Sequence, residues 1–269
     1  MRRDFPEGGS TGLRYHIGDI RDYERVRRSI GNRHRYVLHT AALKRVDTGE
    51  YEPWEFVQTN VNGSWNVIRA CHESGVERCM LISTDKAVAP ITHYGATKLC
   101  MERLGIGANN LGTCGISICR YANVTGSTGS VLPLWQSQKE KGKPLTITDK
   151  RMTRMWISKE DAAEFVLYCL NCFERGCIFV PKFVRARRLI DMAREIAPEP
   201  YPVTEIGLRP HEKLHEVLIS EGDARHTYEQ DIRYTIYPAQ HDWGKVPRRG
   251  VQCDETFRLS SAVLTGGEG

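Results

Sequence analysis

The stretch LISTDKAVAPITHYGATKLCMERL, residues 81–104, decides the fold, because it joins the end of an apolar strand to a loop and a helix. Ser83 and Thr84 close the strand, and Asp85 and Lys86 follow in the loop. Strand, loop and covering helix are the repeating unit of α/β proteins, whose ligands gather beyond the carboxyl ends of the strands. The stretch therefore predicts both the class of fold and the place of a site.

The same alternation extends in both directions from this stretch. We predict strands at 13–17, 36–42, 79–83 and 115–121, and helices at 21–30, 52–75 and 93–110. This order predicts a doubly wound, Rossmann-like parallel sheet. After residue 121 the pattern loosens, as expected for a smaller substrate-binding lobe. We divide the chain into a dinucleotide-binding domain (1–125), a lobe with interleaved sheet elements (126–240) and a tail (241–269).

Composition favours a cytoplasmic protein with reduced thiols. The 269 residues are 40% hydrophobic, yet no apolar run is long enough to span a membrane, and the charged amino terminus lacks the apolar core of a signal peptide. Nine scattered cysteines, an odd number, argue against a disulfide framework. Cys169 and Cys172 form a lone CxxC without a second ligand pair, so we expect no metal site.

The formal charge of +5 comes from dispersed basic pairs such as Arg27 and Arg28 or Arg187 and Arg188. No aromatic residues interleave with them, so nucleic acid is a poor candidate for a partner. A small substrate that carries phosphate needs only two or three well-placed arginines. The charge therefore fits a phosphorylated small molecule better.

Tyr94 and Lys98 are four residues apart and share one face of the predicted helix. An ammonium group beside a phenol lowers the pKa of the phenol from about 10, which would make Tyr94 a usable base. The YxxxK spacing alone is common, and a half-buried tyrosine beside a surface lysine explains it equally well. The upstream hydroxyls of Ser83 and Thr84 favour the functional interpretation.

Together these residues resemble the extended short-chain dehydrogenase/reductase superfamily. STDKAVAPITHYGATK is similar to the signature of its nucleotide-sugar 4,6-dehydratases, in the branch that inverts C5 of UDP-N-acetylglucosamine in polysaccharide and pseudaminic acid biosynthesis. Further blocks of similarity follow in the same order: GDIRD (18–22), HTAALKRV (39–46), TNVNGSWNV (59–67), RYANVTGSTGSVLP (120–133), ITDKRMTRMWIS (147–158), IFVPK (178–182) and GLRPHEKLHE (207–216). The resemblance covers residues 10–240.

The resemblance implies a role for each group in the central stretch. Tyr94 takes the proton of the sugar O4, Lys86 removes the C5 proton, and Asp85 protonates the departing C6 hydroxyl. Thr84 helps to place O4, and Lys98 also binds the nicotinamide ribose. As strand neighbours, Asp85 and Lys86 would point apart, so the loop before Pro90 must turn both inward.

The resemblance also implies binding residues. NADP, with NAD as the alternative, would contact Asp19, Ile20, Ala41, Ala42, Lys44, Asn60, Ser83, Tyr94, Lys98 and Tyr121. The UDP-sugar would contact Lys44, Asn123, Ser130, Val131, Thr148, Arg154, Arg209 and Glu212. Asn60 supports the site, or else is a simple buried amide. His211 stands where the family usually carries glycine, so we expect its loop to lie farther from the ligand.

One family feature does not occur in this sequence. No GxxGxxG turn precedes residue 13, and PEGGSTG (6–12) lacks the apolar strand and amphipathic helix that should flank such a turn. The first two strands of the family fold are therefore expected to be missing, and the ending SSAVLTGGEG likewise looks cut. We expect weakened cofactor binding and a homo-oligomer, with a separately encoded amino-terminal segment as one alternative.

Three functions remain open from the sequence. The first is a nucleotide-sugar 4,6-dehydratase. The second is a degenerate subunit that binds a nucleotide sugar without catalysis, which the missing glycines favour. The third is another extended-type enzyme, such as a sugar 4-epimerase, which would need Tyr94 and Lys98 but not Asp85 and Lys86.

Overall fold

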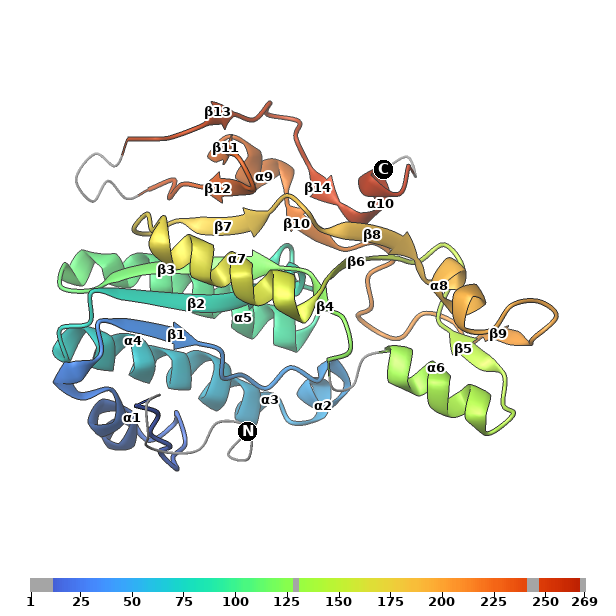
Figure 1. The fold of residues 1–269 in the computed structure, drawn as a ribbon, viewed down its shortest axis with the longest axis horizontal. Helices are drawn as coiled ribbons and strands as arrows, with labels where there is room; N and C mark the ends of the chain where they lie inside the picture. The colour runs from blue at the N-terminus through green and yellow to red at the C-terminus, as the bar shows by residue number, and fades with distance from the viewer. Residues whose placement is uncertain (1–11, 128–130, 241–246, 267–269) are drawn as a thin grey trace.

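A seven-stranded sheet runs through the computed structural model, which describes residues 12–127, 131–240 and 247–266 (Figure 1). Its strands lie in the order β1 (Tyr36–His39), β2 (Arg78–Thr84), β3 (Gly115–Tyr121), β7 (Ile178–Pro181), β12 (Arg233–Ile236), β11 (Thr227–Glu229) and β13 (Val251–Gln252). The first four strands are parallel, as predicted. The last three are antiparallel to their neighbours, so the sheet is mixed rather than all parallel. The three residues between β11 and β12 form too short a link for a parallel crossover.

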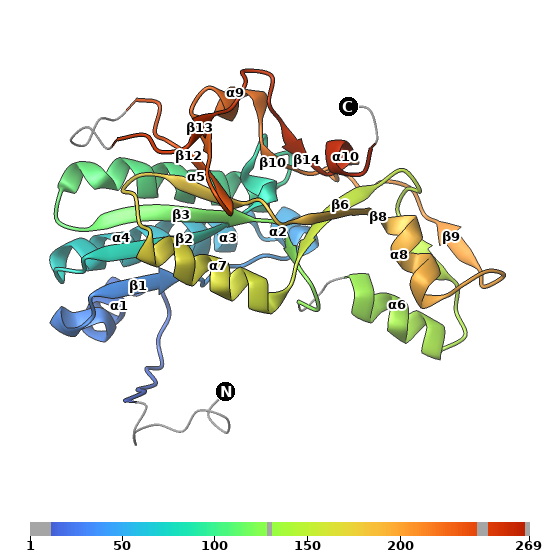
Figure 2. The ribbon, with the colours of Figure 1, turned by 45° about the horizontal axis from the view of Figure 1, so that its top comes forward.

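Helices cover both faces of the sheet (Figure 2). One face packs against α4 (Ser64–Glu73) and α5 (His93–Gly107), with α1 (Tyr23–Ile30) beside α4; the other packs against α7 (Lys159–Asn171). Alternation along β2 explains the two layers, because successive side chains of a strand point to opposite faces. Cys79 and Leu81 join the core under α4 and α5, whereas Met80 joins the core under α7. The doubly wound arrangement predicted from the sequence is confirmed.

The predicted helix at 52–75 is a chain of shorter pieces. After α2 (Val46–Tyr51) come α3 (Pro53–Phe56), a π-helical segment η3 (Val57–Gly63) and α4. Gly75 follows α4 with a φ of +68°, the left-handed conformation that ends many helices. Short 3₁₀ turns complete this half of the chain: η2 (Gly31–Arg33), η4 (Asp85–Ala87) and η5 (Ala108–Leu111).

A smaller lobe lies beyond the carboxyl end of the sheet (Figure 1). It contains α6 (Val131–Glu140), α8 (Leu189–Ile196) and the strand pair β5 (Leu145–Ile147) and β9 (Val203–Glu205). Its buried side chains include Trp135, Leu145 and Met192, which form a cluster of their own. A three-stranded sheet, β4 (Asn123–Val124), β6 (Thr153–Ile157) and β8 (Arg185–Arg188), leads from the large sheet into the lobe.

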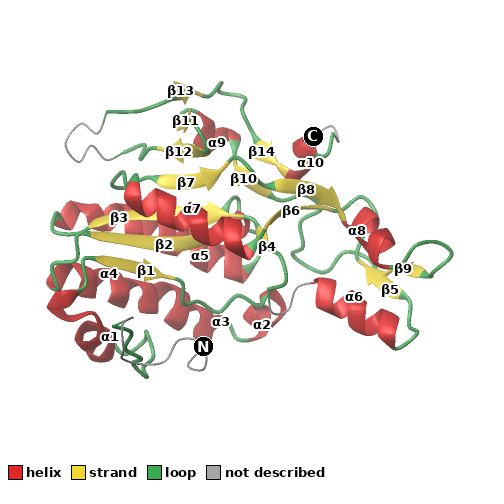
Figure 3. Cartoon of the chain, viewed as in Figure 1, coloured by secondary structure: helices red, strands yellow, loops and turns green. Residues whose placement is uncertain are grey.

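The described residues after 246, which we expected to form a tail, pack onto the rest of the molecule (Figure 3). The strand β14 (Leu259–Ser260) pairs with β10 (Val217–Ile219), which precedes α9 (Glu221–Ala224). The last helix, α10 (Ser261–Leu264), contacts β6 and β8. Ser261 is fully buried, because its hydroxyl is bonded to groups on other elements. The carboxyl-terminal segment thus contributes to the core.

Two strand predictions are wrong. Residues 13–17 form neither helix nor strand, and Ile17 is 86% exposed, because no neighbouring strand in the described residues pairs with them. The strand predicted at 36–42 is shorter and is not buried: it ends at His39, with Tyr36 and Leu38 about two-fifths exposed. Only β2 pairs with β1 among the described residues, so β1 is an edge strand.

All nine cysteines are free. Among the described residues no cluster of His, Cys, Asp and Glu could hold a metal ion. Within the same residues no helix has both the length and the apolar character that a membrane crossing requires.

Candidate active site

The central stretch forms one rigid turn from β2 into α5. Thr84 ends β2, and the hydroxyl of Thr92 caps α5 by accepting the Gly95 N–H at 3.0 Å. A Cβ on Gly95 would lie 2.2 Å from the Lys86 carbonyl oxygen, so only glycine permits this approach of helix and loop. The packing fixes the loop that carries Asp85 and Lys86 against the helix that carries Tyr94.

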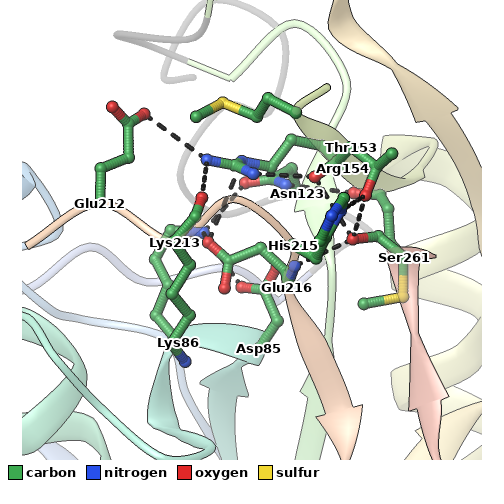
Figure 4. A network of polar contacts seen from close by, with 12 residues as sticks. Asp85, Lys86, Asn123, Thr153, Arg154, Glu212, Lys213, His215, Glu216 and Ser261 are labelled. Atoms are coloured by element: carbon green, nitrogen blue, oxygen red, sulfur yellow. Dashed lines mark hydrogen bonds and ion pairs between the residues drawn. The ribbon is translucent and has the colours of Figure 1, made fainter. Parts of the chain in front are cut away.

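Asp85 and Lys86 both point into one polar cluster (Figure 4). Asp85 is fully buried, and its Oδ1 accepts from Thr84 Oγ1 at 2.8 Å and from Lys86 Nζ at 3.1 Å. Lys86 Nζ also donates to Asn123 Oδ1 at 3.2 Å. The 3₁₀ turn η4 explains how adjacent residues face the same way, since the alternation of a strand stops at Thr84.

Glu216 completes the cluster and was not predicted from the sequence. Its Oε1 lies 3.6 Å from Lys86 Nζ and 4.0 Å from Arg154 Nε. The residue belongs to the block GLRPHEKLHE, so the similarity of that block was the one available signal. Its place opposite Lys86 is decided by the path of the chain before β10.

These charges shift one another's proton affinities. Burial by itself would lower the pKa of Lys86, but the carboxylates of Asp85 and Glu216 outweigh it and raise that pKa above its usual value. Burial raises the pKa of Glu216. Burial also lowers the pKa of Lys213, whose Nζ donates to the Val88 carbonyl at 2.6 Å. In the absence of a ligand Lys86 is therefore held as an ammonium ion.

The expected effect of Lys98 on Tyr94 is wrong. Lys98 Nζ turns away to donate to the Ile82 carbonyl at 2.5 Å and contacts Met101 Sδ at 3.2 Å. Burial raises the pKa of Tyr94 to about 12, and the charge that opposes this shift is that of Lys86. Burial lowers the pKa of Lys98 to about 8. The four-residue spacing puts both residues on one face of the helix, but it does not fix where the ammonium points.

Asn60 ties three segments together. Its Oδ1 accepts the Leu43 N–H at 2.8 Å, and its Nδ2 donates to the Leu43 carbonyl at 2.8 Å and to Thr97 Oγ1 at 3.1 Å. The residue is 1% exposed and lies in the π-helical segment η3. It thereby joins the loop after β1, which carries the predicted cofactor residues Ala41, Ala42 and Lys44, to α5.

Ser83 takes part in a buried network. Its hydroxyl donates to Glu102 Oε1 at 2.6 Å, and Glu102 also accepts two hydrogen bonds from Arg120. Arg120 reaches Asp223 Oδ2 at 3.2 Å. The network links β2, α5, β3 and α9, so Ser83 has a structural partner besides its predicted role toward the cofactor.

Arg154 lies in the cluster, whereas Arg209 lies outside it. Arg154 is 9% exposed and donates to the carbonyls of Thr153, Leu214 and Lys213, with Glu212 Oε1 at 3.5 Å. The exposed Arg209 meets Glu212 through its backbone: its N–H donates to Glu212 Oε2 at 3.3 Å, and its carbonyl accepts the Glu212 N–H at 3.1 Å. His211 adopts a φ of +60°, a left-handed conformation that glycine adopts without steric cost.

The other predicted binding residues are more dispersed. Lys44 is exposed and makes no hydrogen bond or ion pair among the described residues. Thr148 contacts Met152 Sδ at 3.1 Å. Val131 begins α6, and Tyr121 ends β3. Asp19 pairs with Arg21, whose guanidinium holds the pKa of Asp19 below its usual range. Ile20 packs against the core. Ser130 lies outside the described residues.

The residues present fit the nicotinamide end of a dinucleotide better than its diphosphate end. The Lys98 ammonium is buried, with a carbonyl and a thioether as its hydrogen-bond partners. Tyr94 lies on the same helix, α5, which follows the loop after β2. Within the described residues no strand, glycine turn and helix precede α1 to receive a pyrophosphate.

A cavity of about 400 Å³ lies apart from this cluster. Trp156, Phe183, Arg185 and Met192 are among the residues that line it, and none of the predicted site residues does.

The fold and the placement of these side chains define an extended short-chain dehydrogenase/reductase. The chain belongs to the polysaccharide biosynthesis protein family, whose model matches residues 5–238. It is a nucleotide-sugar-modifying member of that superfamily.

Two curated relatives illustrate the similarity. A UDP-N-acetylglucosamine 4,6-dehydratase (inverting) of Campylobacter jejuni is 44% identical over 235 residues, which cover 86% of this chain and 69% of the relative. A UDP-glucose 4-epimerase of Rickettsia akari is 38% identical over 216 residues, which cover 78% of this chain and 63% of the relative.

Solved structures share the fold. Pen from Bacillus thuringiensis superimposes with a TM-score of 0.86 at 30% identity, covering 97% of this chain and 80% of that chain. The dTDP-glucose 4,6-dehydratase DesIV of Streptomyces venezuelae, solved with NAD and TYD bound, gives a TM-score of 0.70 at 20% identity, covering 75% of this chain and 69% of that chain. The second likeness supports the fold alone.

Proposed function

We propose that this chain is a nucleotide-sugar 4,6-dehydratase that converts UDP-N-acetylglucosamine to a UDP-4-keto-6-deoxy sugar with inversion at C5. The observation that carries the proposal is the placement of Asp85 and Lys86 in one cluster, with Lys86 Nζ 3.1 Å from Asp85 Oδ1. Elimination of water across C5 and C6 needs both a base and an acid near adjacent carbons. The similarity to the Campylobacter jejuni dehydratase supports this assignment.

Three side chains divide the proton transfers. Tyr94 accepts the proton of the sugar O4, Lys86 in its amine form takes the C5 proton, and Asp85 gives a proton to the C6 hydroxyl, which leaves as water. A nicotinamide dinucleotide, when bound, would accept hydride from C4 and return hydride to C6. Tyr94 and Lys98 would hold its nicotinamide end, and NADP is our proposal for its identity, with NAD as the alternative.

Two exposed cations outside the cluster suit the diphosphate of the substrate. Arg209 and Lys44 are exposed, and neither side chain has an ion-pair partner among the described residues. Arg154 is instead occupied by three carbonyls and two carboxylates. We therefore assign diphosphate binding to Arg209 and Lys44, and assign to Arg154 the task of shaping the pocket wall.

The test is a product assay with UDP-N-acetylglucosamine and NADP in deuterated water, with the chain supplemented by a peptide that carries an apolar strand and a glycine-rich turn. We expect a 4-keto-6-deoxy product that carries deuterium at C5. Lys86→Met should abolish deuterium uptake at C5 while it leaves oxidation at C4 possible, because the C5 proton then has no acceptor. Normal 6-deoxy product from that variant would remove Lys86 from the mechanism.

The second candidate is a sugar 4-epimerase, which the Rickettsia akari relative favours. Epimerisation needs Tyr94 and Lys98 but gives the buried Asp85 and Lys86 no task. Incubation with UDP-glucose separates the two, since an epimerase returns UDP-galactose without loss of water. Binding of UDP-sugars without turnover by either route would instead support a non-catalytic binding subunit.

A further inference from the structure

The proposed chemistry gives no task to the carboxylate of Glu216, although it lies in the same cluster as Lys86. The residue is 4% exposed, and its Oε1 faces Lys86 Nζ at 3.6 Å. Its Oε2 has no hydrogen-bond partner among the described residues, and the same holds for Asp85 Oδ2. Two incompletely satisfied carboxylates thus flank a single lysine.

A side chain from a distant part of the sequence, Ser261, holds the backbone of Glu216 in place. The Glu216 N–H donates to Ser261 Oγ at 2.9 Å, and Ser261 Oγ also accepts from Thr153 Oγ1 at 2.7 Å (Figure 4). The start of β10, β6 and α10 therefore meet at this residue. A carboxylate on a surface loop would not need such support.

The balance of charge explains why a second carboxylate is needed. The charged and titratable groups around Lys86 and Glu216 are Asp85, Tyr94, Arg154, Glu212, Lys213 and His215. In the proposed reaction Lys86 becomes an ammonium ion when it takes the C5 proton. Until Asp85 has given its own proton to the C6 hydroxyl, Asp85 is neutral and does not balance that charge. An unpaired buried ammonium is costly, so another anion is required at that moment.

We propose that Glu216 is a positioning residue for this reaction: it holds the Lys86 side chain in the site and supplies the negative charge that pairs the ammonium while Asp85 carries its proton. The inference rests on the proposed roles of Asp85 and Lys86. It needs no further reactant, because Glu216 neither forms nor breaks a bond to the substrate.

The first test needs no substrate. The rate at which acetic anhydride modifies Lys86 at pH 9, measured by mass spectrometry, reports the fraction of neutral amine. Glu216→Gln keeps the shape and removes the charge, so we expect the rate to rise about tenfold, equal to a pKa lower by about one unit. Glu216→Asp keeps the charge, so its rate of Lys86 modification should stay near that of the protein without substitutions. Glu205→Gln, an exposed position paired with Lys150, is the matched control and should cause no change.

If Glu216→Gln does not fold, a second variant provides the same test. Ser261→Ala removes the acceptor of the Glu216 N–H, and we expect a smaller rise of the rate in the same direction. An unchanged rate in a folded Glu216→Gln protein, or in Ser261→Ala if the first does not fold, overturns the inference.

The second test separates this inference from the proposed function. With active enzyme, Glu216→Gln should lower kcat and leave the KM for UDP-N-acetylglucosamine near its original value, because the residue touches Lys86 rather than the substrate. If the chain supplemented with that peptide makes no 6-deoxy product, the proposed function fails whatever the labelling shows. If it does make product and Glu216→Gln keeps full kcat, the role of Glu216 fails alone.

Discussion

Lys98 shows at the scale of a single residue how a functional group can oppose stability. Burial lowers its pKa from 10.5 to about 8, so the folded chain binds this proton less tightly than the unfolded chain does. Below about pH 8 the charged Lys98 therefore destabilises the fold, and this penalty disappears as the pH rises from 8 to 10.5. Buried ionisable groups of this kind are typical of functional sites.

We expect Lys98→Met to raise the free energy of unfolding at pH 7 by about 1 to 3 kcal/mol. The gain is smaller than the whole penalty of the lowered Lys98 pKa, because the Ile82 carbonyl loses its hydrogen-bond donor. Urea unfolding at pH 7, 8.5 and 10 should show the advantage shrinking as the pH rises. Lys141→Met, at an exposed position, should show no such trend. A constant difference across the three pH values would contradict the predicted linkage.

Tyr94→Phe tests the acceptor of the O4 proton. The substitution keeps the edge contact of the ring with Phe56, whose centroid lies 6.4 Å away, and deletes only the phenol oxygen. We expect turnover to fall by roughly a hundredfold or more, as for the loss of a positioned acid or base. Thermal unfolding of the variant serves as the control for packing. Turnover within a few-fold of the original would show that another group ionises O4.

At the scale of elements, the contact of α5 with the loop after β2 holds the cluster together. The approach is close enough that Gly95 has no room for a Cβ. At Gly107, which ends the same helix, a Cβ would meet no other atom within 4 Å, and the φ of −62° is an ordinary helical value. The two glycines therefore provide a matched comparison.

Gly95→Ala should displace the loop, lower the free energy of unfolding by about 1 to 3 kcal/mol and strongly reduce turnover. Gly107→Ala should raise the free energy of unfolding by about 0.5 to 1 kcal/mol, since alanine is the better helix former, and leave turnover unchanged. Chemical denaturation and the product assay measure both. If the two variants behave alike, the close contact does not organise the site.

At the scale of the whole molecule, the lobe lies beyond the carboxyl end of the sheet, and α10 of the carboxyl-terminal segment packs against β6 and β8 (Figure 2). The edge strand β1 leaves Tyr36 and Leu38 partly exposed, and the predicted cofactor residues Ala41 and Ala42 follow it in the chain. The described residues thus include the groups proposed to hold the nicotinamide end of a dinucleotide, but no glycine turn for the pyrophosphate.

We expect the 269-residue chain by itself to bind NADP weakly and to turn over UDP-N-acetylglucosamine at a negligible rate, although its proposed catalytic groups are present. Calorimetry with NADP and the product assay test this together. A peptide that carries an apolar strand and a glycine-rich turn, mixed with the chain, should restore both properties. Micromolar binding and measurable product without the peptide would contradict the prediction.

The sequence by itself determined the elements and the class of protein. The strand predicted at 115–121 is β3 residue for residue. The strand predicted at 79–83 matches β2, and the helix predicted at 93–110 matches α5, each within a few positions. Periodicity and caps act between near neighbours, so a short window of residues contains the information. Only the tertiary structure placed Glu216 opposite Lys86, turned Lys98 away from Tyr94 and left residues 13–17 without a strand partner. The physical reason is that ion pairing, desolvation and sheet pairing depend on groups that come from distant parts of the chain.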